Sequence, residues 1–560
     1  MSVLYRLLLR YLILLAALAV CASYLAQAPG TGPVAGLSAA EIAELQAQSA
    51  LDNPRLHFRL LNSRFNPRSS LWSALDAELD AFGEQQYEAL LPQILEQDIP
   101  GLQRAIAQKQ FSYTQLTQFY LYRIRLYEQD NAHYLNALIS LNSMAVDTAR
   151  ERDRQVASGA VVPDPQSVFG MPVLLKDNIG FAGLPTTAGA VVLQDNFAAN
   201  AFITERLEAQ GAIILGKANL SEWAYYFCDA CPLGYSAMGG QTLNPYGRKI
   251  IESGGSSSGS AVAVAANYAV AAVGTETSGS ILSPSSLNSV VGLKPTTGML
   301  SRYGIVPISS TLDTPGPITR NVTDAVILFN AMSGFDQRDL AMPMLSADVH
   351  LQIQPGVLTG RRLGVFDSLV DNASYAALLD VLRGAGAELV IFEGTTTALS
   401  NFSNLLGGEM KRDLAHYLEQ LADSATLVQT ADDVRRFNQM DLELRAPYGQ
   451  GRFDFMAQLN LTESELQTAQ AEMQATALAL LETPLVELRL DALVSMNNVH
   501  AGYAALANYP AITVPAGLRD NGEPLGLTFI APGFAEQILV DLALAFEAVR
   551  QGRVLPADYQ

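Results

Sequence analysis

Cysteine and histidine are scarce in this sequence, with three cysteines and five histidines among 560 residues. Cys21 lies in an apolar N-terminal segment, which leaves Cys228 and Cys231 as a pair. Two ligands cannot complete a zinc site, which needs about four, and no second cluster supplies the rest. We therefore predict no metal site and a structural role for the pair, for which a small-loop disulfide is open in an oxidising compartment.

Basic residues are also in deficit, with 35 Lys plus Arg against 55 Asp plus Glu and a net charge of −20. Such a charge repels nucleic acid and anionic lipid, so we predict no nucleic-acid partner. Apolar residues make up 49% of the chain, which is enough for a large buried core without any sign of disorder. Internal repeats, heptads and low-complexity linkers are also lacking, which favours one large domain.

The N-terminus departs from this globular composition. Two arginines precede a nearly unbroken apolar run over 11–19, a pattern typical of an export signal. Ala26-Gln27-Ala28 has the form of a cleavage site, but Pro29 follows it. Residues 1–28 are thus predicted to be either a signal peptide or an uncleaved anchor that associates with the membrane. Both interpretations predict export, to the periplasm or outside the cell.

The next part of the chain has helical periodicity. Apolar residues recur at three- and four-residue spacing over 39–50 and 111–127, and Ser112 can cap the second stretch. We predict a helical N-terminal extension over 29–100, followed by one large domain over 101–555.

Within the large domain the pattern changes to short apolar runs. Runs at 173–175, 212–215 and 269–273 alternate with Gly-rich turns and helical stretches, which predicts an α/β layered core.

The later part of the chain repeats this alternation and then becomes helical. The runs 363–366 and 389–392 flank a helical stretch and predict a further βαβ-like unit. Residues 405–485 are rich in Gln, Glu, Leu and Ala and are predicted to be helical.

Two glycine-serine loops lie close together in the sequence. The loop 254–260 leads straight into the apolar stretch 261–266, and the loop 274–280 ends in a serine. A helix start presents free N–H groups, but either loop alone is explained as a turn or a helix cap. The two loops gain significance together with a lysine that precedes them.

Lys176 ends the apolar run 173–175 and is followed by Asp177-Asn178. A buried charged lysine is costly, and its ordinary pKa of about 10.4 would have to fall by roughly three units for it to act as a base near neutrality. Desolvation can supply the roughly 4 kcal/mol that this requires. An isolated lysine at the end of a strand more often extends its amine to solvent. The catalytic interpretation of Lys176 therefore depends on the two serine loops that follow it.

These elements, in this order, resemble the amidase signature family over roughly residues 100–550. Lys176, Ser256 and Ser280 occupy the positions of its lysine, its bridging serine and its nucleophile. The further matching segments are Val291–Thr296, Asp313–Pro317 and Tyr509–Pro515. The Gly-Thr-Glu-Thr loop and the run 300–307 are most similar to the bacterial peptide amidase branch.

The resemblance implies an α/β fold with a large mixed β-sheet covered by helices on both faces. It also implies an enzyme that hydrolyses linear amides through an acyl-enzyme on Ser280, with Ser256 and Lys176 as the proton relay and no cofactor. The oxyanion hole would use the backbone N–H groups of the loop that ends at Ser280, and Ser257 would support the site. The implied oxyanion residues are Thr277, Ser278 and Gly279, together with the N–H of Ser280.

The substrate expected from the resemblance is a small-molecule or peptidic amide. Peptide amides, small aliphatic or aromatic amides and lipid amides all stay open. Residues 405–485 and the 223–240 loop are expected to form the pocket walls. The protein is expected to be a monomer or a homodimer.

Other function classes are open to comparison with this one. Gly255-Ser256-Ser257-Ser258-Gly259 satisfies the nucleophile-elbow pattern, with Ser257 as nucleophile and His500 as base of a serine esterase, but turn-rich residues precede it instead of a strand.

A noncatalytic exported binding protein could hold an anion or a peptide end on the serine loops. Residues 211–218 nearly spell a phosphate-binding loop, but Ala218 lacks the magnesium-binding hydroxyl, so we reject nucleotide binding. Export and the acidic charge argue against an amidotransferase acting on aminoacyl-tRNA.

Overall fold

The computed structural model describes residues 36–342, 349–394, 396, 399 and 401–560. The signal peptide or anchor predicted for residues 1–28 lies outside these residues. Within the described ranges, every helix is too short or too polar to cross a membrane.

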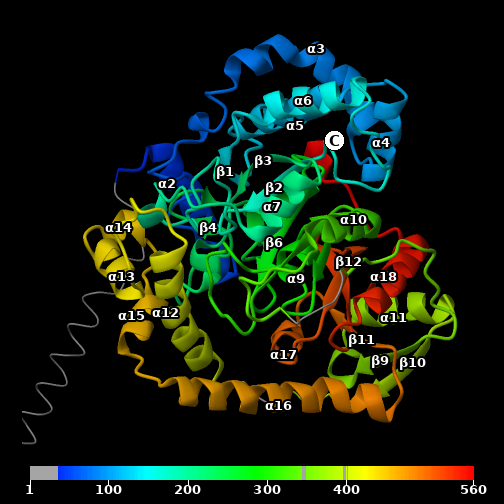
Figure 1. Ribbon diagram of the computed structural model, residues 1–560. Coiled ribbons are helices and arrows are strands. Elements are labelled where there is room, and N and C mark those ends of the chain that lie inside the picture. Colours follow the sequence, from blue (N-terminus) through cyan, green and yellow to red (C-terminus); the bar gives the residue numbers. More distant parts are fainter. Residues whose placement is uncertain (1–35, 343–348, 395, 397–398, 400) are drawn as a thin grey trace, which may run out of the picture.

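One 11-stranded sheet forms the centre of the molecule (Figure 1). Its strands, in spatial order, are β1 (Leu138–Leu141), β3 (Ile213–Ala218), β2 (Pro172–Lys176), β6 (Ala271–Glu276), β8 (Thr314–Thr319), β7 (Val291–Lys294), β12 (Ala511–Leu518), β13 (Pro524–Ile530), β11 (Ala492–Met496), β9 (Arg362–Phe366) and β10 (Glu388–Phe392). A separate two-stranded sheet pairs β4 (Tyr235–Ser236) with β5 (Gly240–Gln241).

The sheet is mixed: β1 pairs antiparallel with β3 at one edge, and two groups of parallel strands flank an antiparallel centre. Strands β3, β2 and β6 run parallel, as do β11, β9 and β10. The pairs from β6 through β8, β7, β12 and β13 to β11 are antiparallel. The predicted strands correspond to β2, β3, β6, β9 and β10, and α11 (Ala373–Gly384) connects the last two as the predicted βαβ-like unit.

Helices cover both faces of the sheet, which confirms the predicted fold class. On one face α8 (Ser258–Ala265) and α9 (Leu282–Leu287) contact each other and the central strands. On the other face α10 (Val322–Met332) packs against β8 and against α18 (Glu536–Arg550). Strands buried on both faces need continuous apolar runs, which is why the sequence pattern could predict them.

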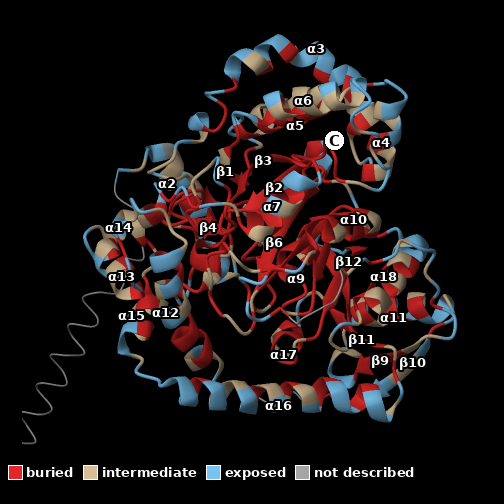
Figure 2. Cartoon of the chain, in the orientation of Figure 1, coloured by how far each residue is buried: buried red, intermediate tan, exposed pale blue. Residues whose placement is uncertain are grey.

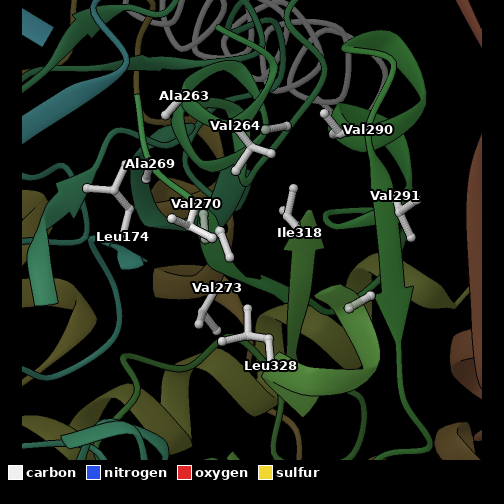
Figure 3. Close-up of a cluster of buried hydrophobic side chains, with 14 of the residues drawn as sticks. Leu174, Ala263, Val264, Ala269, Val270, Val273, Val290, Val291, Ile318 and Leu328 are labelled. Atoms are coloured by element: carbon white, nitrogen blue, oxygen red, sulfur yellow. The ribbon is translucent and has the colours of Figure 1, made fainter. Parts of the chain in front are cut away.

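The apolar core lies between these layers (Figure 3). Figure 3 shows Val264 of α8, Val273 of β6, Ile318 of β8 and Leu328 of α10, each fully buried. Neighbouring residues on a strand point to opposite faces, so the sheet contributes side chains to both layers.

Six helices come from the N-terminal part of the described chain. They are α2 (Ala39–Gln48), α3 (Asp76–Ile94), α4 (Ile99–Ala107), α5 (Tyr113–Glu128), α6 (Ala145–Ala157) and α7 (Phe202–Ala209). Three of them, α5, α6 and α7, contact β2 or β3. Ser112 caps α5 as predicted and forms a capping box with Gln115. Short 3-10 turns lie at Pro54–Leu56, Arg68–Ser70, Val191–Leu193, Glu222–Tyr225, Asp367–Leu369 and Ala557–Tyr559.

A helical region follows β10, as predicted for residues 405–485. It comprises α12 (Phe402–Gln420), α13 (Ala431–Gln439), α14 (Leu442–Arg445), α15 (Gly451–Gln458) and α16 (Glu463–Glu487), with α17 (Ala501–Leu506) after β11. Figure 2 shows the central strands buried and the outer face of α16 exposed, whereas the edge strand β10 is partly exposed. Lys176 ends β2, and the loop that contains Ser280 follows β6, so both lie next to the buried centre of the sheet.

Candidate active site

Lys176 is the last residue of β2, an interior strand that is buried at every position. Its Nζ donates to Ser256 Oγ at 2.7 Å, to Thr275 Oγ1 at 2.9 Å and to Thr275 O at 3.1 Å. Burial lowers the pKa of Lys176 from 10.5 to about 7, because the charged amine loses its solvation. Near neutral pH, a large fraction of this amine is neutral and able to accept a proton.

Two carboxylates oppose the effect of burial on Lys176. Asp313 and, more weakly, Glu276 raise its pKa through their negative charge. Asp313 itself accepts hydrogen bonds from Thr277 Oγ1 and from two backbone N–H groups, those of Ile308 and Ser309. The loop after β6 is thus tied to an acidic group that also acts on the lysine.

A buried ion pair holds the chain directly after Lys176. Lys217, on the adjacent strand β3, places its Nζ 3.5 Å from Asp177 Oδ1, and both side chains are fully buried. Lys217 also donates to Thr186 Oγ1 at 2.9 Å and to the Ile179 carbonyl. Because these contacts fix both sides of the turn, they restrict where the end of β2 can lie.

Ser256 and Ser257 lie in the turn that opens α8, and both are fully buried. The Ser256 carbonyl accepts from the Ser221 N–H at 3.0 Å. Ser257 connects two neighbouring segments: its Oγ donates to Thr275 O at 3.0 Å, and its N–H donates to Ser280 O at 3.1 Å. The backbone of Ser280 therefore lies directly beside the Ser256–Ser257 turn.

Glu276 shapes the loop between β6 and α9. Its buried carboxylate accepts three backbone N–H groups, those of Gly279 at 2.7 Å, Ile281 at 2.7 Å and Leu282 at 3.0 Å. Gly279 takes a φ of +84°, which a residue without a β-carbon adopts readily. One carboxylate thus holds the turn that presents Ser280.

The Glu276 carboxylate occupies one of the four backbone N–H groups that the resemblance implies for the oxyanion hole. The Gly279 N–H is engaged by Glu276. By contrast, the N–H groups of Thr277, Ser278 and Ser280 have no hydrogen-bond acceptor among the described residues. These three N–H groups are therefore the ones free to bind an oxygen that gains negative charge.

Two cavities border this network on different sides. The Ser280 cavity, about 600 Å³, is lined by Gly255, Ser278 and Ser280. The Thr275 cavity, about 570 Å³, is lined by Asn178, Thr275 and Thr277, which lie on the Lys176 side.

The walls of the two cavities come from different parts of the chain. The Ser280 cavity is also lined by Asn53, Arg55, Tyr225, Leu233, Glu252, Asn497, Asn498, Asn521 and Glu523. Residues of α12, including Arg412 and His416, line the Thr275 cavity instead. The 223–240 loop thus contributes to the Ser280 cavity as predicted, the 405–485 region borders the other cavity, and the wall formed by the N-terminal segment 53–56 was not expected.

The arrangement of a lysine, two serine loops and a tight turn matches a known protein family. The amidase family model matches residues 115–540, about three quarters of the chain. The chain belongs to the amidase family. Amidase relatives and peptide amidase structures identify it as an amide-hydrolysing enzyme.

Individual relatives support the same family. The probable amidase At4g34880 of Arabidopsis thaliana is 36% identical over 81% of this chain and 90% of its own length. A glutamyl-tRNA(Gln) amidotransferase subunit of Deinococcus deserti is 34% identical over 75% of this chain and 90% of its own length. The solved peptide amidase from Stenotrophomonas maltophilia is 35% identical, covers 82% of this chain and 98% of its own, and superimposes with a TM-score of 0.77.

The nucleophile-elbow interpretation finds no support in this amidase. His500 is almost fully buried, its Nδ1 lies 2.7 Å from Ser495 Oγ, and its ring stacks on Phe366. Burial lowers the pKa of His500 to about 4. Ser257 donates to Thr275 and not to this histidine, so the structure does not bring the two predicted partners together.

The loop next to Tyr225 carries the cysteine pair of the amidase. Cys228 and Cys231 are joined by a disulfide and are both buried. The structure therefore agrees with a structural role for these residues.

Glu276→Gln is expected to lower kcat for amide hydrolysis by about tenfold to hundredfold, because it would displace the free N–H groups of Thr277, Ser278 and Ser280 without removing any of them. Complete loss of one oxyanion donor costs roughly a hundredfold to a thousandfold. A glutamine amide would direct N–H groups at backbone N–H groups and loosen the turn. Removal of the negative charge also lowers the pKa of Lys176 further, so the acid limb of kcat/KM moves to lower pH. Steady-state kinetics between pH 5 and 9 measures both effects.

Glu128→Gln is the matched control for this substitution. Glu128 is also fully buried and accepts three backbone N–H groups, from Leu135, Asn136 and Ala137. Among the described residues, only Asp313 and Glu276 raise the pKa of Lys176 through their charge, so Glu128 has no part in that effect. The Glu128→Gln variant should have a lower free energy of unfolding than the wild type, and the acid limb of its kcat/KM profile should stay at the wild-type pH. An unchanged acid limb in Glu276→Gln would contradict the electrostatic effect on Lys176.

Proposed function

We propose that this enzyme hydrolyses carboxylic amides, C-terminal peptide amides among them, through an acyl-enzyme on Ser280, with Ser256 and Lys176 as the proton relay. The observation that carries the proposal is the 2.7 Å contact between a buried lysine amine with a pKa near 7 and Ser256 Oγ. The backbone hydrogen bond between Ser257 and Ser280 supports it by bringing the second serine loop alongside.

In the first half-reaction, Ser280 Oγ attacks the amide carbonyl carbon. Its proton passes to Ser256 Oγ, and the proton of Ser256 passes to neutral Lys176. The carbonyl oxygen gains negative charge and is held by the free N–H groups of Thr277, Ser278 and Ser280. The C–N bond then breaks as the relay returns the proton to the leaving nitrogen, and ammonia or an amine departs.

In the second half-reaction, water replaces the departed amine. It attacks the acyl carbon and gives a proton to the same relay. The bond between the acyl carbon and Ser280 Oγ then breaks, the relay returns the proton to Ser280 Oγ, and the carboxylic acid departs. Ser257 supports this chemistry by fixing the Ser256 turn against Thr275, which itself contacts the lysine amine.

We further infer that the enzyme acts outside the cytoplasm. The charged and apolar pattern of residues 1–28 supports export, and so does the Cys228–Cys231 disulfide, since such bonds persist in oxidising compartments. Recovery of the protein with cytoplasmic markers during cell fractionation would contradict this inference.

Ammonia release from a panel of amides tests the proposed function. The panel contains a dipeptide C-terminal amide, benzamide, a fatty-acid amide and free glutamine, each incubated with the full chain. We expect turnover of at least one linear amide and little turnover of glutamine, the nitrogen donor that an amidotransferase would use. Folded protein that releases ammonia from none of them, and does not react with a serine-directed fluorophosphonate, would support the noncatalytic binding role instead.

A further inference from the structure

Asn498 lies against the turn that presents Ser280. A β-carbon on Gly279 would lie 3.0 Å from Asn498 Nδ2 and 3.5 Å from the β-carbon of Ala501. Asn498 follows β11, and α17 begins three residues later. The segment between β11 and α17 therefore packs on the loop whose N–H groups face the reacting oxygen.

The carboxamide of Asn498 is available to a ligand. Its side chain is exposed and lines the Ser280 cavity together with Ser278 and Ser280. In the described part of the chain, neither the Oδ1 nor the Nδ2 of this side chain has a hydrogen-bond partner. The neighbouring Asn497, in contrast, accepts the Gly526 N–H at 2.9 Å and is committed to the backbone.

The rest of this cavity wall is also rich in polar groups. Asn53 and Arg55 both contact Glu252, at 2.6 Å and 3.6 Å, and Asn521 and Glu523 of the β12–β13 turn line the same cavity. An alkyl chain in such a cavity would cover polar groups and leave them without hydrogen bonds. The wall suits a substrate that carries hydrogen-bonding groups of its own.

We propose that Asn498 binds the peptide group that precedes the scissile amide, and that it thereby selects C-terminally amidated peptides over fatty-acid amides. A carboxamide donates and accepts at once, and so it matches the C=O and N–H of a peptide group. Its place beside Gly279 puts this interaction one residue from Ser280. The inference rests on the proposed function of the same site.

A matched pair of substrates tests the role of Asn498. N-acetylphenylalanine amide contains a peptide group next to the scissile amide, and 3-phenylpropanamide lacks only that acetylamino group. We expect Asn498→Leu to lower the ratio of their kcat/KM values by about tenfold to hundredfold, because the peptide group then loses both hydrogen bonds. Asn498→Asp keeps the size and the acceptors but loses the donor, so it should lower the ratio by a smaller factor.

Asn460→Leu is the control, because Asn460 is an exposed asparagine on the loop after α15 and lies outside both cavities. It should leave the ratio unchanged. A ratio within twofold of wild type in Asn498→Leu, with the fluorophosphonate reaction retained, would overturn the role of Asn498 while the proposed function stands. Wild-type protein that hydrolyses neither substrate nor any other amide of the panel would overturn the proposed function itself.

Discussion

Replacing Ser280 by alanine is expected to lower kcat for amide hydrolysis by roughly four to six orders of magnitude. The substitution removes the oxygen that forms the acyl bond, and neither Ser256 nor Lys176 can replace it, because both are fully buried while Ser280 reaches a cavity. Ammonia release under saturating amide measures the loss. The residual rate would reflect binding and the N–H groups of the turn alone.

The fold should tolerate this change. Among the described residues, none accepts from or donates to Ser280 Oγ, so the free energy of unfolding should stay within about 0.5 kcal/mol of wild type. A fluorophosphonate should add to Ser280 in the wild type and to no residue in Ser280→Ala. Ser283→Ala, in the same cavity, should still be labelled. An adduct on Ser257 would contradict the assignment of the nucleophile.

Local sequence patterns were sufficient to predict the elements that carry the chemistry. The apolar run before Lys176 indicated an interior strand because a strand buried on both faces has no polar alternation. Ser112 indicated the start of α5 because serine is a favoured N-cap residue, and the structure adds a capping box with Gln115. The positions of Ser256 and Ser280 followed from their resemblance to family motifs.

Contacts between distant parts of the chain could not be predicted in this way. The pairing of Asp177 with Lys217 depends on the register of β2 with β3. Asn498 reaches Gly279 because α9, which follows the Gly279 turn, packs across β7, β12 and β13, and β13 pairs with β11. These segments are more than two hundred residues apart in sequence. Glu276 stood in the recognised loop, yet its three N–H contacts arise from a turn geometry that residue types alone do not determine.

Lys176→Met is expected to lower kcat/KM by roughly a hundredfold to ten-thousandfold, the usual contribution of a positioned general base. Methionine has a similar length and no proton-accepting nitrogen. In the wild type, kcat/KM should rise as pH passes through about 7, where the neutral amine becomes the main form, and should level off above it. The variant should lose this rise. A wild-type profile that is flat from pH 6 to 9 would contradict Lys176 as the base.

The Lys176 amine links activity to stability, because both kcat/KM and the free energy of unfolding should increase as the pH rises and this amine loses its proton. The pKa of Lys176 is about 7 in the folded chain and 10.5 without burial, so between these values the unfolded chain binds the additional proton. The free energy of unfolding must therefore rise with pH across that window, by about 1.4 kcal/mol per pH unit. Below pH 7 the folded chain carries the buried Lys176 amine in its charged form, which lowers the free energy of unfolding by the full amount of about 5 kcal/mol. Urea unfolding at pH 7, 8 and 9 should show this slope in the wild type relative to Lys176→Met. Equal slopes would mean that the folded chain keeps the amine charged, and the proton relay would then lack its acceptor.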